Sequence, residues 1–297
     1  CLNTFRDWGG TCLGLRHLHL ANNIILYMTS KYSFSRLPWW LLAIIVSGIL
    51  LTWHIAADTG YQKIFNTLSQ GIATTVTVTL IAFLIACIIG LIMALAGFSR
   101  YRLVREVARF YVEVIRGVPV LVLLFYIAFV GAPELVDFYN WLMQKPIEWQ
   151  WLDKARTRDF NMVWRAILAL CISYSAFIAE VFRAGIQEVD KGQIEAAKAL
   201  GLSSWQRFRF IIFPQAFRKI LPPLGNDFVA MIKDSALVSA LGVQDITQLG
   251  KVYSSSSFQF FETYNVVAFV YLCLTITLSL LIRGFEQYLN RKQKHEL

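Results

Sequence analysis

The sequence predicts an all-α membrane protein with six transmembrane helices, and three observations support this fold class. Of the 297 residues, 57% are hydrophobic and only 16% are charged, whereas soluble domains carry roughly 25% charged residues. The mean hydropathy is +0.52, and the apolar residues gather in blocks near the ~20 residues that a helix needs to cross a bilayer. Lysine and arginine are frequent in every second connection between these blocks, as in chains that cross a membrane repeatedly. The same composition and length exclude intrinsic disorder and a small disulfide-built secreted module.

The first three apolar blocks lie in the N-terminal half of the chain. The first, Leu37–Ala57, opens with Trp39 and Trp40, aromatic residues that suit a headgroup boundary. The second, Gly71–Phe98, has no charge in 28 residues. As a helix it would be about 42 Å long, so we expect it to tilt or to project beyond the bilayer. The third extends from about Val107 to Val130 and contains charged residues.

The other three blocks follow in the C-terminal half. They span Met162 to Phe182, about Leu224 to Leu241, and Asn265 to Ile282. The fifth block includes two adjacent charges, which makes it less apolar than the others. With six spans, an even number, both ends of the chain lie on the same side of the membrane.

The distribution of lysine and arginine predicts the orientation. On one side there are four before the first span, four around the second connection, seven from Arg183 to Lys219 and four at the C-terminal end, nineteen in all. The other side carries six. Because positive charge accumulates in the cytoplasm, we expect both termini to be cytoplasmic. This distribution also accounts for the net charge of +9, which therefore gives no indication of a nucleic-acid partner.

Small residues recur every four positions along the second block, at Ala82, Ala86, Gly90 and Ala94. Residues at this spacing share one face of a helix, where another helix can approach closely. The alternative is that alanine and glycine are simply common in membrane helices.

Charged residues inside membrane spans are costly, so they usually face protein or water. Glu113 with Arg116, and Glu180 with Arg183, are three residues apart and can form pairs within one helix. Such pairs either stabilise the fold or contribute to a solute path, and the spacing does not distinguish these roles. We expect Arg165, within a turn of its helix end, to extend to the surface. The candidates among the charges within the predicted spans are Glu113, Arg116, Arg165, Glu180, Lys233 and Asp234.

The connection after the fourth span has the most specific pattern. Glu188–Leu200 is rich in helix-forming residues, and Gly201 is the usual residue that ends a helix. Ser203 with Gln206 predicts a capping box that starts a second helix, which we expect to stop at Pro214. The alternative is an amphipathic loop lying on the lipid surface, which four residues would favour: Trp205, Arg207, Phe208 and Arg209.

This connection resembles the EAA loop of the integral membrane permeases of ATP-binding cassette importers. The matching pattern is Glu195-Ala196-Ala197, three residues, Gly201, nine residues, Ile211, one residue, Phe213 and Pro214. Phe213 stands where leucine is usual. Three further stretches are similar to the polar amino acid branch of that family: 111–121, 179–195 and 233–239. In the third, Ser235 and Ala236 stand where the family often has threonine and serine.

The resemblance covers about Gly71 to Gln287 and implies a five-helix importer permease core. Its domains would then be 71–287, containing the coupling loop 183–223, an N-terminal segment 1–70 with an extra transmembrane helix, and a cytoplasmic tail 288–297. The implied partners are cytoplasmic ATP-binding cassette subunits, a second permease subunit that is the same or similar, an extracytoplasmic amino acid-binding protein and membrane lipid. The implied location is a bacterial inner membrane. The residues implied to couple to the ATPase are Glu195, Ala196, Ala197, Gly201 and Pro214.

The chain lacks the phosphate-binding G-x-x-x-x-G-K-[ST] loop, so ATP would be bound and hydrolysed by partner subunits, and we expect no cofactor in the chain itself. A zwitterionic amino acid needs partners for both of its charges. Glu180 could meet its ammonium and Arg116 its carboxylate. The candidate solute path therefore comprises Glu113, Arg116, Glu180, Lys233 and Asp234.

Two other classes of protein were compared with this interpretation. A secondary transporter or channel for small polar solutes often has internal repeats, and we find none in the sequence. A membrane enzyme would need a catalytic motif, and neither H-E-x-x-H nor G-x-S-x-G is present. No two of the five cysteines have the spacing of metal ligands.

Overall fold

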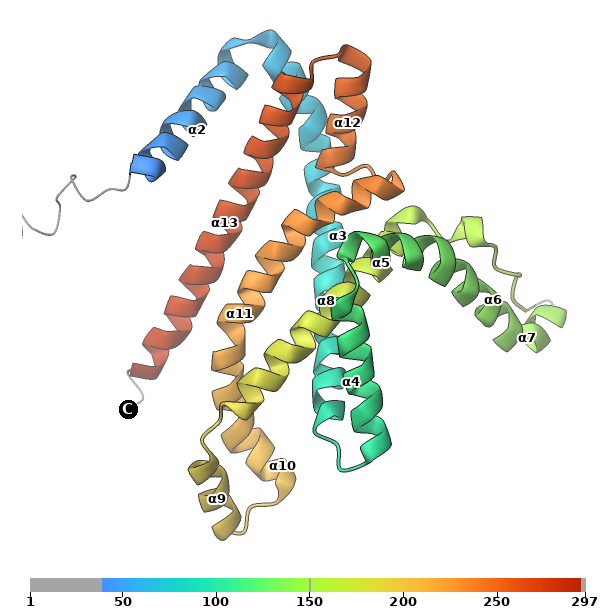
Figure 1. The fold of residues 1–297 in the computed structure, drawn as a ribbon, viewed down its shortest axis with the longest axis vertical. Coiled ribbons are helices and arrows are strands. Elements are labelled where there is room, and N and C mark those ends of the chain that lie inside the picture. The colour runs from blue at the N-terminus through green and yellow to red at the C-terminus, as the bar shows by residue number, and fades with distance from the viewer. Residues whose placement is uncertain (1–38, 150, 295–297) are drawn as a thin grey trace, which may run out of the picture. The chain divides into compact units, whose positions relative to one another are not determined.

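The computed structural model describes residues 39–149 and 151–294. Throughout these residues the regular structure is helical, which confirms the all-α class (Figure 1). The chain divides into two units, residues 1–54 and 55–297. Helix α2 (Trp39–Ala57) begins in the first unit. Its apolar part, Leu42–Ala57, is shorter than the helical segments of the second unit that are long enough to cross a membrane. Residues 1–38 of the predicted N-terminal segment and 295–297 of the predicted tail lie outside the described residues.

Within the described ranges, four helical segments are long and apolar enough to cross a membrane. Two of them contain the fourth and sixth predicted spans, and a third contains the second predicted span up to Gly97. They are α3 (Thr59–Gly97), α8 (Met162–Gln187) and Phe260–Leu289 of α13 (Phe260–Lys294). The predicted fifth span falls on α11 (Phe213–Asp234) and a following 3₁₀ turn, which does not meet this criterion because charged residues interrupt it.

The fourth membrane-crossing segment corrects the third predicted span. Helix α4 (Arg102–Gly117) ends before Pro119, and the apolar segment Val120–Leu142 begins after it. One helix from Val107 to Val130 is therefore wrong. The cause is Pro119, which disfavours helical geometry in the residue before it, and Val118 is extended, with ψ 135°. The segment after the proline comprises α5 (Val120–Tyr126), a π-helical turn (Ile127–Gly131) and α6 (Ala132–Leu142).

Helices α3 and α8 cross at the centre of the second unit (Figure 1). All four small residues of the predicted stripe on α3, from Ala82 to Ala94, are buried. A Cβ atom built on Gly90 would lie 2.9 Å from the backbone oxygen of Ser175 on α8. The close approach expected from the sequence is thus confirmed, and it leaves no room for a larger side chain at Gly90. The largest fully buried side chains of this core are Leu124, Leu170, Ile178 and Met231.

A second cluster joins the start of α3 to α12 (Ile246–Ser257) and α13. Asp245 caps α12 by accepting a hydrogen bond from the backbone N–H of Gln248 (2.8 Å), and the Tyr271 hydroxyl donates to the same carboxylate (3.2 Å). Burial raises the pKa of the Asp245 carboxyl, although these hydrogen bonds oppose the shift. The start of α12 also contacts the first half of α3, where the Thr75 hydroxyl accepts a hydrogen bond from the Ile246 N–H (3.3 Å). These bonds hold the connection that follows α11 against α3.

Arg165 corrects another expectation. It does not extend to the surface but is buried, with 6% of its area exposed. Its guanidinium donates to the backbone oxygens of Phe160 (2.9 Å), Ala128 (3.2 Å) and Thr157. A buried guanidinium is stable where carbonyl oxygens satisfy its donors. Arg165 thereby anchors the connection before α8, whose short elements are α7 (Gln144–Glu148) and a 3₁₀ turn (Thr157–Asp159).

Candidate coupling loop and translocation path

The predicted helix and glycine turn after α8 are present. Helix α9 (Lys191–Ala199) starts at Asp190, whose carboxylate accepts a hydrogen bond from the Gly192 N–H (2.7 Å). Gly201 has φ +76°, a left-handed conformation that favours glycine. The N–H groups of Gly201 and Leu202 donate to the oxygens of Lys198 (2.9 Å) and Ala197 (3.1 Å), the paired bonds of a Schellman motif. The chain therefore reverses sharply at Gly201.

The helix after this turn begins as expected but does not end as expected. Ser203 and Gln206 form the predicted capping box, with N–H to side-chain distances of 2.8 and 3.3 Å. From there α10 (Ser204–Arg207) passes through a π-helical turn (Phe208–Ile212) directly into α11, so the stop at Pro214 is wrong. Proline lacks the N–H that a helix interior uses. Pro214 lies directly after the π-helical turn, in the first turn of α11, where the helical hydrogen-bond pattern already changes.

The loop is attached firmly to the end of α8. The Lys219 ammonium donates to the backbone oxygen of Glu188 (2.6 Å) and lies 3.4 Å from its carboxylate. A second bond joins the side chains of Gln215 and Gln193 (2.6 Å). A Cβ atom on Gly185 would collide with Ile220. These contacts, with an apolar cluster of Val189, Ala216 and Ile220, hold α9 and the first turns of α11 to α8 as one body.

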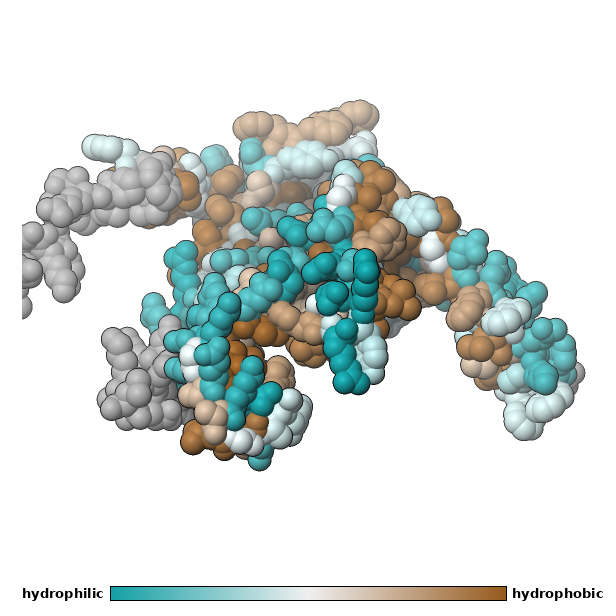
Figure 2. Space-filling model, turned by 60° about the horizontal axis from the view of Figure 1, so that its bottom comes forward, coloured by the Kyte–Doolittle hydropathy of each residue, from teal (hydrophilic) through white to brown (hydrophobic). Residues whose placement is uncertain are grey.

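The residues of the EAA pattern divide into an outward and an inward set. Glu195 and Ala196 are exposed, whereas Ala197 is buried. Beside the glycine turn, Leu200 is 80% exposed and Trp205 69% exposed. Figure 2 brings this end of the protein forward and shows hydrophilic residues gathered on it. The loop thus presents polar and apolar groups outward while its inner face is packed.

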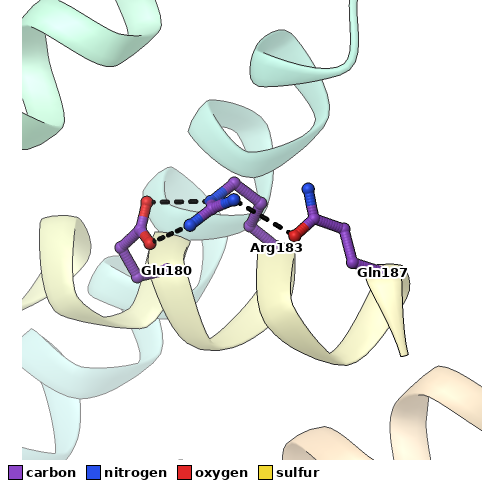
Figure 3. Close-up of polar contacts among 3 residues, drawn as sticks. All are labelled: Glu180, Arg183 and Gln187. Carbon is purple, nitrogen blue, oxygen red and sulfur yellow. Dashed lines mark hydrogen bonds and ion pairs between the residues drawn. The ribbon is translucent and has the colours of Figure 1, made fainter.

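Of the predicted pairs of charges, the one on α8 is formed (Figure 3). The Arg183 guanidinium donates to both carboxylate oxygens of Glu180, at 3.0 and 2.6 Å. Its remaining terminal nitrogen donates to the Gln187 side-chain oxygen (3.1 Å). This geometry holds the Arg183 guanidinium between the two acceptors, and it is compatible with both roles considered for the pair, stabilising the fold and contributing to a solute path.

The expected pair on α4 is not formed. Across the residues that the structure describes, Glu113 and Arg116 make no ion pair with each other. The Arg116 guanidinium lies over the Phe177 ring, 5.8 Å from its centre. Both α4 charges instead act across the interface with α8, since Arg116 interacts electrostatically with Glu180 and Glu113 with Arg183.

The two charges predicted on the fifth span have different surroundings. Lys233 is exposed, whereas Asp234 accepts a hydrogen bond from the Tyr174 hydroxyl of α8 (2.7 Å). The structure therefore does not bring these two residues together with Glu113 and Glu180.

Sequence reasoning missed Asp227 on α11. Its Oδ2 atom is buried and has no hydrogen-bond partner in the described part of the chain. Asp227 lies seven residues before Asp234, on the same face of the helix, and interacts electrostatically with Tyr174 and Cys87. Its position inside the predicted fifth span was the signal that could have identified it.

Glu113 and Glu180 line one cavity, of about 510 Å³, between α3, α4 and α8. Among its other lining residues are Arg109, Arg183 and Gln187. The cavity therefore contains carboxylates, guanidinium groups and an amide within one volume. No group of three or more histidine, cysteine, aspartate or glutamate residues that could hold a metal ion occurs in residues 39–149 and 151–294.

Comparison with known proteins matches residues 86–295 to the family described as the binding-protein-dependent transport system inner membrane component. The chain is 34% identical over 227 residues to the "Probable amino-acid permease protein YxeN" of Bacillus subtilis (strain 168), covering 76% of this chain and 93% of that protein. It is 33% identical over 223 residues to the glutamine transport system permease protein GlnP of Escherichia coli (strain K12), covering 74% and 91%.

A solved structure, a crystal structure of an amino acid ABC transporter with histidines, is also similar. It has a TM-score of 0.64 and 34% sequence identity, and the match covers 79% of this chain and 98% of that one. An inward-facing structure of the MetNI methionine ABC transporter, at 18% identity and a TM-score of 0.58, supports the fold.

Proposed function

Because the chain belongs to the family of inner membrane components of binding-protein-dependent transport systems, we propose that it is the permease subunit of an ATP-driven amino acid importer. The relatives named as amino-acid and glutamine permeases support the class of solute. The observation that carries the proposal is the loop around Gly201, which is sharply turned, outwardly exposed and attached to α8. Such a loop suits docking of a separate motor subunit.

The coupling would proceed as follows. An ATPase subunit engages the exposed Glu195 and Ala196, while the buried Ala197 and the Gly201 turn keep α9 in a fixed orientation. Pro214 begins the helix that leads back into the membrane. Helix α9 is bonded to α11 through Gln193 and Gln215, and α11 is bonded to the end of α8 through Lys219. Displacement of α9 would therefore move these helices as a rigid body, which can open a path alternately to each side.

We propose the membrane arrangement that the cationic residues favour, with six spans and both termini cytoplasmic. Residues 71–287 would form the five-helix core, with the coupling loop 183–223 facing the cytoplasm, and 1–70 would add one helix. The hydrophilic end in Figure 2 fits a cytoplasmic face. The tail 288–297 would lie on the same side.

The proposed partners follow from the family. Two cytoplasmic ATP-binding cassette subunits would hydrolyse ATP, since this chain lacks the phosphate-binding loop. A second permease subunit would complete the path, and an extracytoplasmic binding protein would deliver the amino acid.

The solute path would use charges on α4, α8 and α11. Glu113 and Glu180 line the cavity, and Arg116 acts across the same helix interface. Asp234 of α11, with Lys233 beside it, would contribute where it contacts Tyr174 of α8. Asp227 of the same helix adds a carboxylate oxygen that has no hydrogen-bond partner among the described residues. A carboxylate without a partner in a low-dielectric region is costly, so it suits a position that an ammonium visits.

The proposal is tested by purifying the tagged chain from its own cells and reconstituting it. We expect an ATPase subunit to co-purify, and uptake of a radiolabelled amino acid to require ATP on the side of α9. Uptake that continues without ATP while an ion gradient is maintained would instead identify a secondary transporter. A Glu195→Lys variant, which alters only an exposed charge on the loop, should lose the ATPase, whereas Glu134→Gln on α6 should retain it.

A further inference from the structure

Helices α11 and α13 lie side by side in the second unit (Figure 1), and an apolar groove of about 300 Å³ lies between them. All of its lining residues are apolar, and they come from α3, α11 and α13. The volume is at the lower end of the range of about 300–1,000 Å³ that is typical of small-molecule sites. The groove is distinct from the cavity between α3, α4 and α8, with which it shares no lining residue.

The groove is closed on its inner side and open on its outer side. On the inner side, the Phe83 and Phe228 rings pack with their centroids 4.8 Å apart. A Cβ atom built on Gly225 would lie 2.5 Å from the Ile282 side chain, so α11 and α13 touch there. On the outer side, Leu281 is 64% exposed.

The surroundings of the groove are those of a membrane span. Leu281 lies in Phe260–Leu289, which is long and apolar enough to cross a membrane, so an exposed side chain there meets lipid hydrocarbon unless another protein covers it. An unfilled groove would forfeit the dispersion contacts of its walls. A helix of another protein is about 10 Å wide, so it could cover the groove but not fill it. A single acyl chain is narrow enough to enter.

A cation and an aromatic hydroxyl follow the groove at one end. Arg218 precedes Leu221 by three residues and Gly225 by seven, so all three lie on one face of α11. Arg218 is exposed and forms no ion pair within 4.0 Å among the described residues. Tyr288, which is 60% exposed, lies seven residues after Leu281 on α13. A guanidinium binds phosphate with two hydrogen bonds, and tyrosine is enriched at the level of the headgroups.

We propose that the groove binds one acyl chain of a phospholipid of the cytoplasmic leaflet, and that Arg218 binds the phosphate of the same molecule. From Arg218 to Phe228 the helix is about 15 Å long at 1.5 Å per residue, which equals the hydrocarbon depth of one leaflet, half of ~30 Å. The inference rests on the proposed function only for the identity of the leaflet, because Arg218 lies at the end of α11 that follows the coupling turn.

A bound lipid would stabilise this arrangement of α11 and α13. Pro222 and Pro223 lie within the stretch of α11 that lines the groove, and proline inside a helix removes a backbone hydrogen bond. An acyl chain in the groove would contact α11 on both sides of this pair, at Leu221 and at Leu224. A ligand that binds one arrangement better than another shifts the population toward it. The lipid therefore holds α11 in the shape that the structure shows.

The test labels the groove directly. The complete complex is reconstituted in vesicles of phosphatidylethanolamine and phosphatidylglycerol that contain a trace of phosphatidylglycerol with a photoreactive diazirine in one acyl chain. After illumination, labelled peptides are identified by mass spectrometry. We expect residues 221–228 and 281–285 to be labelled more strongly than residues 84–92 of α3, where Leu84 and Ile88 are also exposed but do not line the groove.

Two exposed leucines next to each other on α13 give matched variants. Leu281 is 64% exposed and lines the groove, whereas Leu280 is 62% exposed and does not. Leu281→Trp should fill the groove and remove its label, and Leu280→Trp should leave the label unchanged.

The phosphate contact is tested by competition. Unlabelled phosphatidylglycerol should displace the labelled lipid, whereas a diacylglycerol with the same chains, which has no phosphate, should compete weakly. Arg218→Gln should raise the half-competing concentration of phosphatidylglycerol about tenfold, since it removes hydrogen bonds between charged groups. Because Arg218 is exposed, this arm stays decisive if Leu281→Trp fails to assemble.

The inference is overturned if the groove is labelled no more strongly than residues 84–92, if Leu281→Trp leaves the label unchanged, or if the two lipids compete equally. A cross-link between two permease copies through a photoreactive residue at position 281 would assign the groove to a second copy and reject the lipid. The labelling requires no transport. A complex whose groove is labelled but which imports no amino acid would therefore contradict the proposed function and not this inference.

Discussion

Replacing Gly201 tests whether the backbone reversal after α9 is needed for coupling. Gly201 has φ +76°, and a Cβ atom built there meets no atom of the described residues within 4 Å. A substitution therefore acts through backbone conformation and not through packing. A residue other than glycine in the left-handed conformation lowers the stability of the turn by about 1–2 kcal/mol. Among such residues, asparagine tolerates this conformation best.

Proline is a more severe change at the same position. It fixes φ near −65°, which is incompatible with +76°. It also removes the N–H that donates to Lys198 (2.9 Å), a bond worth about 0.5–1.5 kcal/mol. The Schellman turn cannot form, so α9 would leave in another direction. We expect transport to decrease in the order glycine, asparagine, alanine, proline, with Gly201→Pro inactive.

The assay measures ATP-dependent uptake by the reconstituted complex, normalised to the amount of permease inserted in the membrane. Gly284→Ala is the matched control. Gly284 lies in α13, where a Cβ atom would meet none of the residues that the structure describes, and alanine favours a helix. Normal uptake by Gly201→Pro, or equal loss in Gly284→Ala, would refute the reasoning that the turn geometry carries the coupling.

Further predictions concern topology, docking, the path and packing. A reporter fused after residue 297 should be active only in the cytoplasm, and activity outside would reject the orientation. Glu195→Lys should abolish uptake while membrane insertion, measured by fractionation, stays normal. Glu180→Gln and Arg116→Gln should each change the apparent affinity for solute, and a variant that assembles and transports with unchanged affinity removes that residue from the path. Gly90→Leu should lower the melting temperature, since its Cβ would lie 2.9 Å from backbone and overpacking costs about 1–3 kcal/mol.

Features set by local chemistry were predictable from the sequence. The turn at Gly201 and the capping box from Ser203 to Gln206 depend on residues close in the chain, and both are present. The stripe around Gly90 was predictable too, because its four-residue spacing defines one helix face. The sequence did not reveal that α8 is the helix that packs there.

The errors arise where tertiary structure decides between local options. Pro119 breaks a helix while Pro214 does not, because Pro214 follows a π-helical turn and lies in the first turn of α11. Arg165 is buried because carbonyl oxygens of two segments, Ala128 in the π-helical turn and Thr157 with Phe160 before α8, converge on it. Asp227 required knowledge of which face of α11 is buried. None of these environments is encoded in sequence spacing alone.

The continuity of α10 and α11 has a mechanical consequence. From Ser204 to Asp234 the helix is uninterrupted, about 45 Å of lever at 1.5 Å per residue. Pro222 and Pro223 lie within it and leave the oxygens of Arg218 and Lys219 without their usual helical donors. The lever can therefore bend at its middle. The half before this point is held to the end of α8 through Lys219, and the half after it is held to the middle of α8 by the hydrogen bond that the Tyr174 hydroxyl donates to Asp234. A bend between these two attachments would change how α11 lies against α8.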